Sequence, residues 1–276
     1  SEVDDLVRIA DMSLNSEPAV IEAIDRACAA AARRHGVVLM ADLGDLREGF
    51  YDADELIRCA VWVDKELAHV DLLGIGTNLG CYGSINATPD KMLDLVSLAE
   101  AVEAAIGRPL EIVSGGGTTS FPLVMNGTMP SKINHLRIGE GIAVGKDLQD
   151  IWNIPMPFLY TDVFTLQAEL VEIKRKPSYP QGEIFVDCFG NCGTYVDRGI
   201  RKRGILAVGK VDFALDSQLV PLTEGVEVLG SSSDHLIVDL EDCPTPPAVG
   251  DVMEFGLRYS TMVYLTSSPY VRVVVK

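Results

Sequence analysis

The sequence predicts an α/β domain with a parallel sheet, followed by a domain built mainly of antiparallel strands. Apolar runs of strand length alternate with helical patterns over about the first 150 residues, as in proteins made of β/α units. Beyond Tyr160 the helical patterns stop, and strand-like runs follow one another between turn signals. The chain has 276 residues, of which 47% are hydrophobic and 23% charged. This composition is typical of a globular protein, and the length allows two domains with their own cores.

Five strands are predicted in the first half, each a short apolar run bounded by polar or glycine-containing segments. They are expected at residues 10–14, 37–41, 70–76, 110–114 and 134–138. The first long helix is expected to have Ser16 as its N-cap and Pro18 in its first turn, and to end at His35-Gly36. Two more helices are expected at 54–68 and 88–106, the second with Thr88 as its N-cap. Strands joined by helices form a parallel sheet, either open or closed into a barrel.

The second half is predicted to be rich in β-strands. Proline- and glycine-containing turn signals separate apolar runs there. The strands are expected at 163–173, 204–209, 226–229, 235–240, 252–257, 259–265 and 271–275. We therefore predict two domains, residues 1–157 and 158–276, joined around residues 152–160.

Charge and cysteine usage limit the function classes. Lysine and arginine number 23 against 40 aspartates and glutamates, which gives a formal net charge of -17. Such a surface repels phosphate backbones, so nucleic acid is not expected as a partner. No run of about 18 apolar residues is present, so no membrane-spanning helix and no membrane partner are expected. The six cysteines include no CxxC pair with zinc spacing, so we expect no metal site and a cytoplasmic location.

Functional residues are expected in the loops that follow the parallel strands, because ligands bind at the carboxyl ends of such strands. Four loops qualify, at 42–49, 77–80, 114–120 and 137–141. The loop 114–120 offers backbone N–H groups and hydroxyls without an acidic side chain, which suits a phosphate, although a flexible turn has the same composition. Arg137 ends an otherwise apolar strand, where it needs either a structural ion pair or a ligand.

Four segments, taken in this order, give the chain its resemblance to a known family. They are Asp42-Leu-Gly-Asp-Leu-Arg47-Glu-Gly49, Leu73-Gly-Ile-Gly-Thr-Asn78, the loop 114–120 and Leu136-Arg137-Ile-Gly139. Together they resemble the alanine racemase family, the fold-type III group of pyridoxal-phosphate enzymes. Two further segments, Ser13-Leu-Asn-Ser16 and Ser232-Ser-Asp-His235, look most like its ornithine racemase branch. The resemblance covers essentially the whole chain and implies a (β/α)8 barrel followed by an antiparallel β domain.

The resemblance also implies a site for pyridoxal 5'-phosphate. Arg137 matches the family's arginine that faces the pyridine nitrogen, where a cation disfavours protonation of the ring and weakens it as an electron sink. Asn78 takes the place of a family histidine beside the ring, and Arg47 matches a catalytic arginine near the phenol oxygen and the substrate. The other cofactor-binding residues match phosphate-binding segments of the family. They are Ser114, Gly116, Gly117, Thr118, Thr119, Gly139 and Tyr259. Without the resemblance, Tyr259 would be read as an ordinary aromatic residue of a strand.

The sequence departs from the family pattern at the cofactor lysine. The family carries this lysine at the end of its first barrel strand, and no lysine here has a matching setting. Five β/α strands are visible where eight should close the barrel. We therefore expect the native chain to extend about 80 residues in front of Ser1 and to carry the lysine there. The alternative is an open relic of the fold without cofactor.

Two further departures concern the proton-transferring groups. Met40 stands where many alanine racemases have a modifiable lysine, so carbamate chemistry is not expected. The family's second base is a tyrosine, and the corresponding segment 185–195 has no tyrosine at the matching place. The candidates for this base are Asp187, Cys188, Tyr195 and His235. A turn at the entry of a strand would explain His235 equally well.

The resemblance predicts an amino-acid racemase that moves a proton at Cα with one base on each face of the substrate. Ornithine is the first expected substrate and alanine the second, and a homodimer with shared active sites is implied. A non-catalytic pyridoxal-phosphate-binding protein of the same barrel is the alternative from a different class, but it lacks a β domain. A decarboxylase of the same fold type is longer and carries a specificity segment that is not found here.

Overall fold

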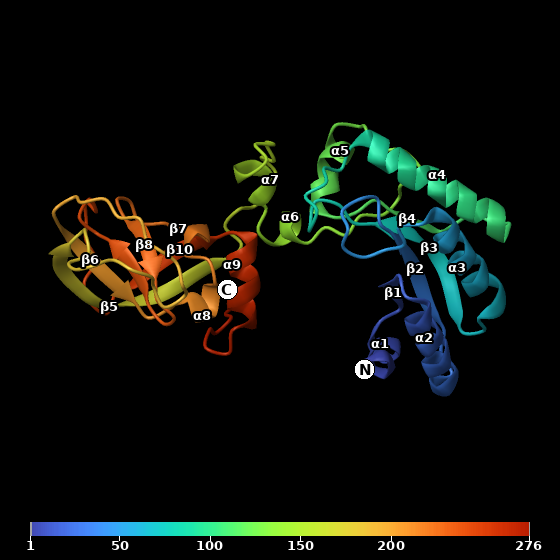
Figure 1. Ribbon diagram of the computed structural model, residues 1–276, viewed down its shortest axis with the longest axis horizontal. Helices are drawn as coiled ribbons and strands as arrows, with labels where there is room; N and C mark the ends of the chain where they lie inside the picture. Colours follow the sequence, from blue (N-terminus) through green and yellow to red (C-terminus); the bar gives the residue numbers. More distant parts are fainter. Residues whose placement is uncertain (1, 276) are drawn as a thin grey trace. The chain divides into compact units, whose positions relative to one another are not determined.

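The computed structural model describes residues 2–275, which form two compact units (Figure 1). One unit ends at Gly139 and the other begins at Glu140. Residues 140–157, which the sequence interpretation placed in the first domain, belong to the second unit in the structure.

The first unit is built on a parallel sheet of four strands. These are β1 (Met12–Asn15), β2 (His35–Ala41), β3 (Val70–Thr77) and β4 (Ile112–Ser114), hydrogen-bonded in the order β1-β2-β3-β4. Spatial order that follows chain order is the arrangement of a barrel wall, whereas a doubly wound sheet reverses direction at a switch point. The sheet is therefore an arc of a β/α barrel.

Helices connect these strands and cover one face of the sheet. They are α1 (Val3–Ile9), α2 (Pro18–Ala31), α3 (Ala53–Glu66), α4 (Pro89–Ile106) and α5 (Phe121–Met125), the last preceded by the 3-10 turn η1 (Thr118–Ser120). Apolar side chains of α2, α3 and α4 share a buried core with alternate residues of β2 and with β3. This core holds the strand ends rigidly, and their loops are where the candidate site lies.

The helix boundaries follow capping chemistry. The predicted start of α4 is confirmed, because the Thr88 side chain accepts a hydrogen bond from the backbone N–H of Lys91. The predicted N-cap Ser16 is wrong: Glu17 occupies the N-cap position, and Pro18 begins α2. This helix also ends at Ala31, earlier than predicted, because Ala32 turns into the left-handed region at φ 50°.

The fifth predicted strand, at 134–138, is a single β-bridge rather than a regular strand. Ser114 and His135 form this parallel bridge, and the backbone N–H of Arg137 donates to the Gly116 carbonyl oxygen at 2.8 Å. The Asn134 side chain takes the place of ladder bonds, since its Oδ1 accepts from the Val113 N–H and its Nδ2 donates to the Glu111 carbonyl oxygen. The segment therefore runs alongside β4 and continues the arc.

The second unit is a six-stranded antiparallel sheet. Its strands are β5 (Thr165–Pro177), β6 (Ile200–Leu206), β7 (Leu219–Pro221), β8 (Glu227–Ser231), β9 (Leu236–Asp239) and β10 (Val252–Leu257). They pair in the order β7-β10-β5-β6-β9-β8 around a separate apolar core. Its short helical segments are α6 (Glu140–Ala143), α7 (Asp147–Asp150), α8 (Lys210–Phe213) and the 3-10 turn η2 (Asp216–Gln218).

Two strands predicted at the end of the chain are wrong. Residues 259–265 lie in helix α9 (Tyr259–Ser267), which packs beside α8 (Figure 1). Thr261 caps it, because its Oγ1 accepts from the backbone N–H of Arg258, and Thr261 and Leu265 are buried four residues apart on one helix face. Residues 271–275 form no strand. Among the described residues, no helix is long and apolar enough to cross a membrane.

Candidate active site at the carboxyl ends of the parallel strands

Arg137 lies where β3 and β4 end. Its Nη1 donates to the Ser114 hydroxyl at 2.6 Å, and its Nη2 donates to the Thr77 carbonyl oxygen at 2.9 Å. Both partners are neutral, and within residues 2–275 the structure gives this arginine no carboxylate within ion-pair distance. Burial lowers the pKa of Arg137, while the negative charge of Glu48 opposes this shift. Among the described residues Arg137 therefore has no structural ion pair, and its contact with a ligand stays a prediction.

Ser114 joins Arg137 to a histidine that the sequence interpretation missed. The Ser114 side chain is fully buried, and its Oγ lies 2.9 Å from Nδ1 of His135. His135 and Arg137 are two residues apart in an extended segment, so their side chains leave on the same side. This two-residue spacing was the feature of the sequence that could have pointed to His135. The Ser114 hydroxyl is thus committed to Arg137 and His135, not to the phosphate contact expected for it.

The glycine loop after β4 is tightly packed. Gly116 has φ +103°, and a Cβ added there would lie 2.7 Å from the Ser120 hydroxyl. A Cβ on Gly117 would meet the Arg137 carbonyl oxygen at 3.1 Å. Thr119 Oγ1 donates to the Leu79 carbonyl oxygen at 2.8 Å. The flexible-turn interpretation of this loop is therefore disfavoured, because packing and hydrogen bonds fix its backbone.

Two buried polar atoms near these strand ends have no hydrogen-bond partner among the described residues. They are Nδ2 of Asn78, directly after β3, and the hydroxyl of Ser120, at the end of η1. Buried polar groups normally have partners, so such atoms call for a ligand or solvent. An amide N–H and a hydroxyl can both donate to a phosphate or phenol oxygen. The donor set at this edge therefore fits an anionic, oxygen-rich group.

The loop after β3 is held by a buried carboxylate. Asp45 accepts hydrogen bonds from the backbone N–H groups of Gly80, Cys81, Tyr82 and Ile85, at 2.9 to 3.3 Å. Burial alone would raise the pKa of Asp45, but these bonds stabilise its anion and hold the pKa below the usual value. This anchor fixes the loop that begins at Asn78.

Arg47 lies on the loop after β2 and is partly exposed. It forms a two-pronged ion pair with its neighbour Glu48, and its Nη1 contacts the Cys81 sulfur. The pKa of Glu48 is lowered first by the hydrogen bonds from Arg47, and the charge of Arg137 adds to the effect. Glu48 interacts electrostatically with both Arg47 and Arg137. The two arginines therefore lie near each other at the carboxyl ends of the parallel strands.

Thr118 and Gly139 complete the residues predicted for this unit. Thr118 begins η1, and Gly139 is exposed with no atom within 4 Å of the position that a Cβ would take. The sheet edge therefore gathers Arg47, Asn78, the loop 114–120 and Arg137. Their cofactor-binding and catalytic roles stay predictions.

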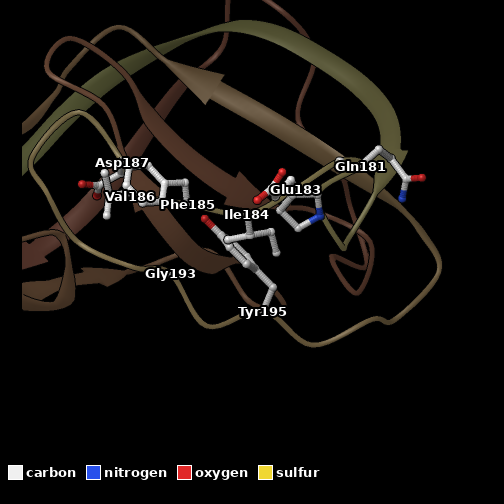
Figure 2. Close-up of a pocket in the computed structure, with 10 residues that line it drawn as sticks. Gln181, Glu183, Ile184, Phe185, Val186, Asp187, Gly193 and Tyr195 are labelled. Carbon is white, nitrogen blue, oxygen red and sulfur yellow. The ribbon is translucent and has the colours of Figure 1, made fainter.

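Three of the candidates for the second base lie on the loop 178–199 of the second unit, and Figure 2 shows two of them, Asp187 and Tyr195. Asp187 closes a tight turn by accepting from the backbone N–H groups of Asn191 and Phe189, and these bonds hold its pKa below the usual value. The Tyr195 hydroxyl lies against Gly193, because a Cβ on Gly193 would be 2.5 Å from this hydroxyl. Cys188 is exposed with a free thiol. A carboxylate with a lowered pKa is a weak base, so Asp187 is the least suited of the three.

His235 and Tyr259 occupy other places in the second unit. His235 is exposed in the turn between β8 and β9, where Ser232 N–H donates to its carbonyl oxygen at 2.9 Å. The interpretation of His235 as a turn residue is therefore supported. Tyr259 is the first residue of α9 and is half-exposed, not a strand residue. The roles predicted for both stay predictions. Among residues 2–275, no group of three metal-ligating side chains is placed to hold a metal ion.

The fold of the first unit is that of a β/α-barrel protein. At the carboxyl ends of its strands lie a half-buried arginine and a tightly packed glycine loop. The family described as alanine racemase, N-terminal domain, matches residues 1–146, and the chain belongs to the alanine racemase family. The family and the fold class predicted from the sequence are thus confirmed.

Two relatives resemble the chain over nearly its whole length. The ornithine racemase of Acetoanaerobium sticklandii is 40% identical over 273 residues, which cover 98% of this chain and 75% of the relative. The lysine racemase of Thermotoga maritima is 39% identical over 281 residues, which cover 99% of this chain and 75% of the relative. The chain thus spans three quarters of the length of both relatives.

Solved structures agree on the fold. A D-threonine aldolase from Filomicrobium marinum matches with TM-score 0.64 and 17% identity, over 95% of this chain and 64% of that chain. An alanine racemase from Bartonella henselae with covalently bound pyridoxal phosphate matches with TM-score 0.59 and 16% identity, over 92% of this chain and 66% of that chain.

Proposed function

We propose that this protein is a pyridoxal-phosphate-dependent amino-acid racemase that acts on a basic amino acid, with ornithine as the first candidate. The observation that carries the proposal is the half-buried guanidinium of Arg137, held by neutral partners beside a rigid glycine loop. In the family that the chain belongs to, the resemblance matches Arg137 to an arginine that faces the pyridine nitrogen of the cofactor. The relatives named ornithine racemase and lysine racemase support a substrate with a second amino group.

The residues at the sheet edge fit the cofactor. The glycine loop would hold the phosphate, because the positive φ of Gly116 and the nearby Ser120 hydroxyl disfavour a side chain there, and that hydroxyl is buried without a partner among the described residues. Asn78 would face the ring with its unpartnered amide, and Arg137 would face the pyridine nitrogen. In the proposed complex, Thr118, Thr119 and Gly139 complete this phosphate site, and the contact of Tyr259 with the phosphate stays a separate proposal.

The bound cofactor would supply an electron sink that acidifies the Cα–H bond of the substrate. Arg137 contributes a fixed positive charge, because a guanidinium keeps its proton even where burial lowers its pKa. That charge opposes protonation of the ring nitrogen, which favours return of the proton to Cα over transamination. In the proposed complex Arg47 would hold the carboxylate of the substrate.

Racemisation needs a proton donor and acceptor on each face of Cα. We propose that one of these groups is Cys188, Tyr195 or His235, since Asp187 is held in its ionised form by backbone N–H groups. The resemblance to the family implies that the β domain of one subunit supplies this group to another subunit. We therefore propose a homodimer with shared active sites, located in the cytoplasm.

Chiral chromatography of reaction products tests this function. The full-length protein, loaded with pyridoxal phosphate, is incubated separately with L-ornithine, L-lysine and L-alanine. We expect D-ornithine to form with kcat/KM at least about tenfold above that for L-alanine, because a site built for a charged group discriminates strongly against its absence. A protein that binds the cofactor but forms no D-amino acid would instead be the non-catalytic binder.

A further inference from the structure

The Ser114 hydroxyl makes two hydrogen bonds in a fully buried position. It accepts from Nη1 of Arg137 at 2.6 Å and lies 2.9 Å from Nδ1 of His135. A second serine–histidine pair, Ser13 Oγ and His35 Nε2, also lies at 2.9 Å in the same sheet. Only the first pair touches a residue of the candidate site.

We propose that His135 is a positioning residue for Arg137, acting through the Ser114 hydroxyl. The inference rests on the proposed function, because Arg137 has its role toward the cofactor only there. His135 itself touches neither cofactor nor substrate in this proposal. It fixes the oxygen that receives the guanidinium.

Counting donors and acceptors gives the position of each proton. A guanidinium can only donate, so Arg137 occupies one lone pair of the Ser114 oxygen. The Ser114 proton then needs an acceptor in a site without solvent contact, and Nδ1 of His135 is the acceptor within reach. His135 is therefore neutral, with its own proton on Nε2.

The electrostatic environment of His135 agrees with a neutral ring. Burial and the charge of Arg137 both lower its pKa. A protonated ring could not accept from Ser114 and would place a second cation beside the guanidinium.

These hydrogen bonds fix the orientation of the Arg137 guanidinium. A hydroxyl that donates to a histidine is a better acceptor for a second hydrogen bond. Together with the Thr77 carbonyl oxygen, Ser114 holds the two terminal nitrogens of Arg137 at different strand ends. Without the His135 acceptor, the Ser114 hydroxyl has to donate elsewhere. The hydrogen bond from Nη1 of Arg137 to Ser114 is then weakened.

Nitrogen-15 NMR of the histidine rings in the cofactor-free protein tests the proton positions. The signals of His135 are assigned by their disappearance in His135→Asn. We expect an unprotonated Nδ1 and a protonated Nε2 at neutral pH. A proton on Nδ1 would overturn the inference, whether or not the protein is a racemase.

Steady-state kinetics of the loaded, full-length protein test the role. For His135→Ala we expect kcat to fall about tenfold while KM changes less than twofold, with more cofactor converted to pyridoxamine phosphate per turnover. His135→Asn should stay within about threefold of the parent, because its amide oxygen can accept at the place of Nδ1. His35→Asn and His35→Ala are the matched controls for loss of a partly buried serine–histidine bond and should change the conversion ratio little.

Parent-like behaviour of His135→Ala, or an equal loss in His135→Asn, would overturn the inference. Should His135→Ala fail to fold, Ser114→Ala tests the same link, since it removes the hydroxyl and keeps the histidine. It should reproduce the rise in pyridoxamine formation. Absence of racemase activity in the parent would refute the proposed function and leave the NMR result standing.

Discussion

Nη2 of Arg137 donates to the carbonyl oxygen of Thr77 at 2.9 Å, although the two residues are 60 positions apart in the chain. Thr77 is the last residue of β3 and is fully buried, and its own hydroxyl donates to the Ala41 carbonyl oxygen at the end of β2. One set of hydrogen bonds thus ties the carboxyl ends of neighbouring strands to the charged group of the candidate site. The sheet therefore holds the guanidinium group in one position.

Arg137→Glu should redirect the chemistry. A glutamate can share a proton with the ring nitrogen, which makes the ring a stronger electron sink and favours transamination over racemisation. We expect racemisation to fall at least about 100-fold and pyridoxamine formation per turnover to rise. Absorbance of the cofactor and chiral chromatography measure the two rates. Arg26→Glu, on the exposed face of α2, makes the same charge change away from the site. An unchanged ratio in folded, loaded Arg137→Glu would show that Arg137 does not face the ring nitrogen.

Replacing Gly116 and Gly117 together with Asp should weaken cofactor binding by at least about tenfold, because it adds bulk and negative charge where the phosphate is proposed to lie. The structure adds a steric reason, since a Cβ at Gly116 would meet the Ser120 hydroxyl at 2.7 Å. Fluorescence titration with pyridoxal phosphate measures the dissociation constant. Gly127→Asp is the control for a side chain at positive φ, because Gly127 has φ +66° and no atom within 4 Å of its Cβ position. Parent-like titration of the folded double variant would place the phosphate elsewhere.

Gly74→Ala should destabilise the first unit. A Cβ at this position of β3 would lie 1.8 Å from the Ile112 carbonyl oxygen, which belongs to the backbone of β4 and cannot move without breaking the sheet. We expect the free energy of unfolding to fall by about 3 kcal/mol or more, at the upper end of overpacking costs. Urea denaturation measures it. Gly139→Ala, with open space at its Cβ position, should change it by less than about 0.5 kcal/mol. Equal stability of the two variants would contradict the packing of β3 on β4.

Asp147→Asn should stabilise the protein above pH 6. Burial and the neighbouring Glu140 raise the pKa of Asp147 to about 6, and one of its carboxylate oxygens is buried without a partner among the described residues. An acid whose folded pKa is raised costs stability as pH rises from its ordinary pKa to the folded value, and the loss persists above it. We expect a gain of about 1–2 kcal/mol at pH 7 that vanishes near pH 4. Thermal unfolding at both pH values measures the gain, with Asp162→Asn, an exposed aspartate of the same unit, as control. A gain of equal size at both pH values would show that ionisation of Asp147 is not its cause.

The parallel half was predictable because its signals are local. Thr88, Pro89 and Gly107 mark both ends of α4, and the continuous apolar run of β2 is typical of a strand covered on both faces. Helix α9 was not predictable in this way, since Tyr259 to Leu265 is rich in strand-forming residues and its helical form depends on burial of Thr261 and Leu265.

The candidate site was predictable only in part, because motifs identify residues that bind a ligand and not those that hold them. Arg137, Asn78 and the glycine loop follow from their places after strands. Asp45 and His135 do not, since their roles depend on hydrogen bonds to residues 35–40 and 21 positions away. For His135, the two-residue spacing to Arg137 was a signal, but spacing alone does not show that its ring meets the Ser114 hydroxyl.

Hydrogen exchange at Cα tests the proposed racemase most directly. L-Ornithine is incubated in D2O with the full-length, cofactor-loaded protein, and proton NMR follows the Cα–H signal while chiral chromatography follows the enantiomers. We predict that the Cα–H signal disappears as D-ornithine accumulates toward an equal mixture, and that Arg137→Glu slows the appearance of D-ornithine. Retention of the Cα–H signal by a protein that has bound pyridoxal phosphate would contradict racemisation and identify a cofactor-binding protein without this activity.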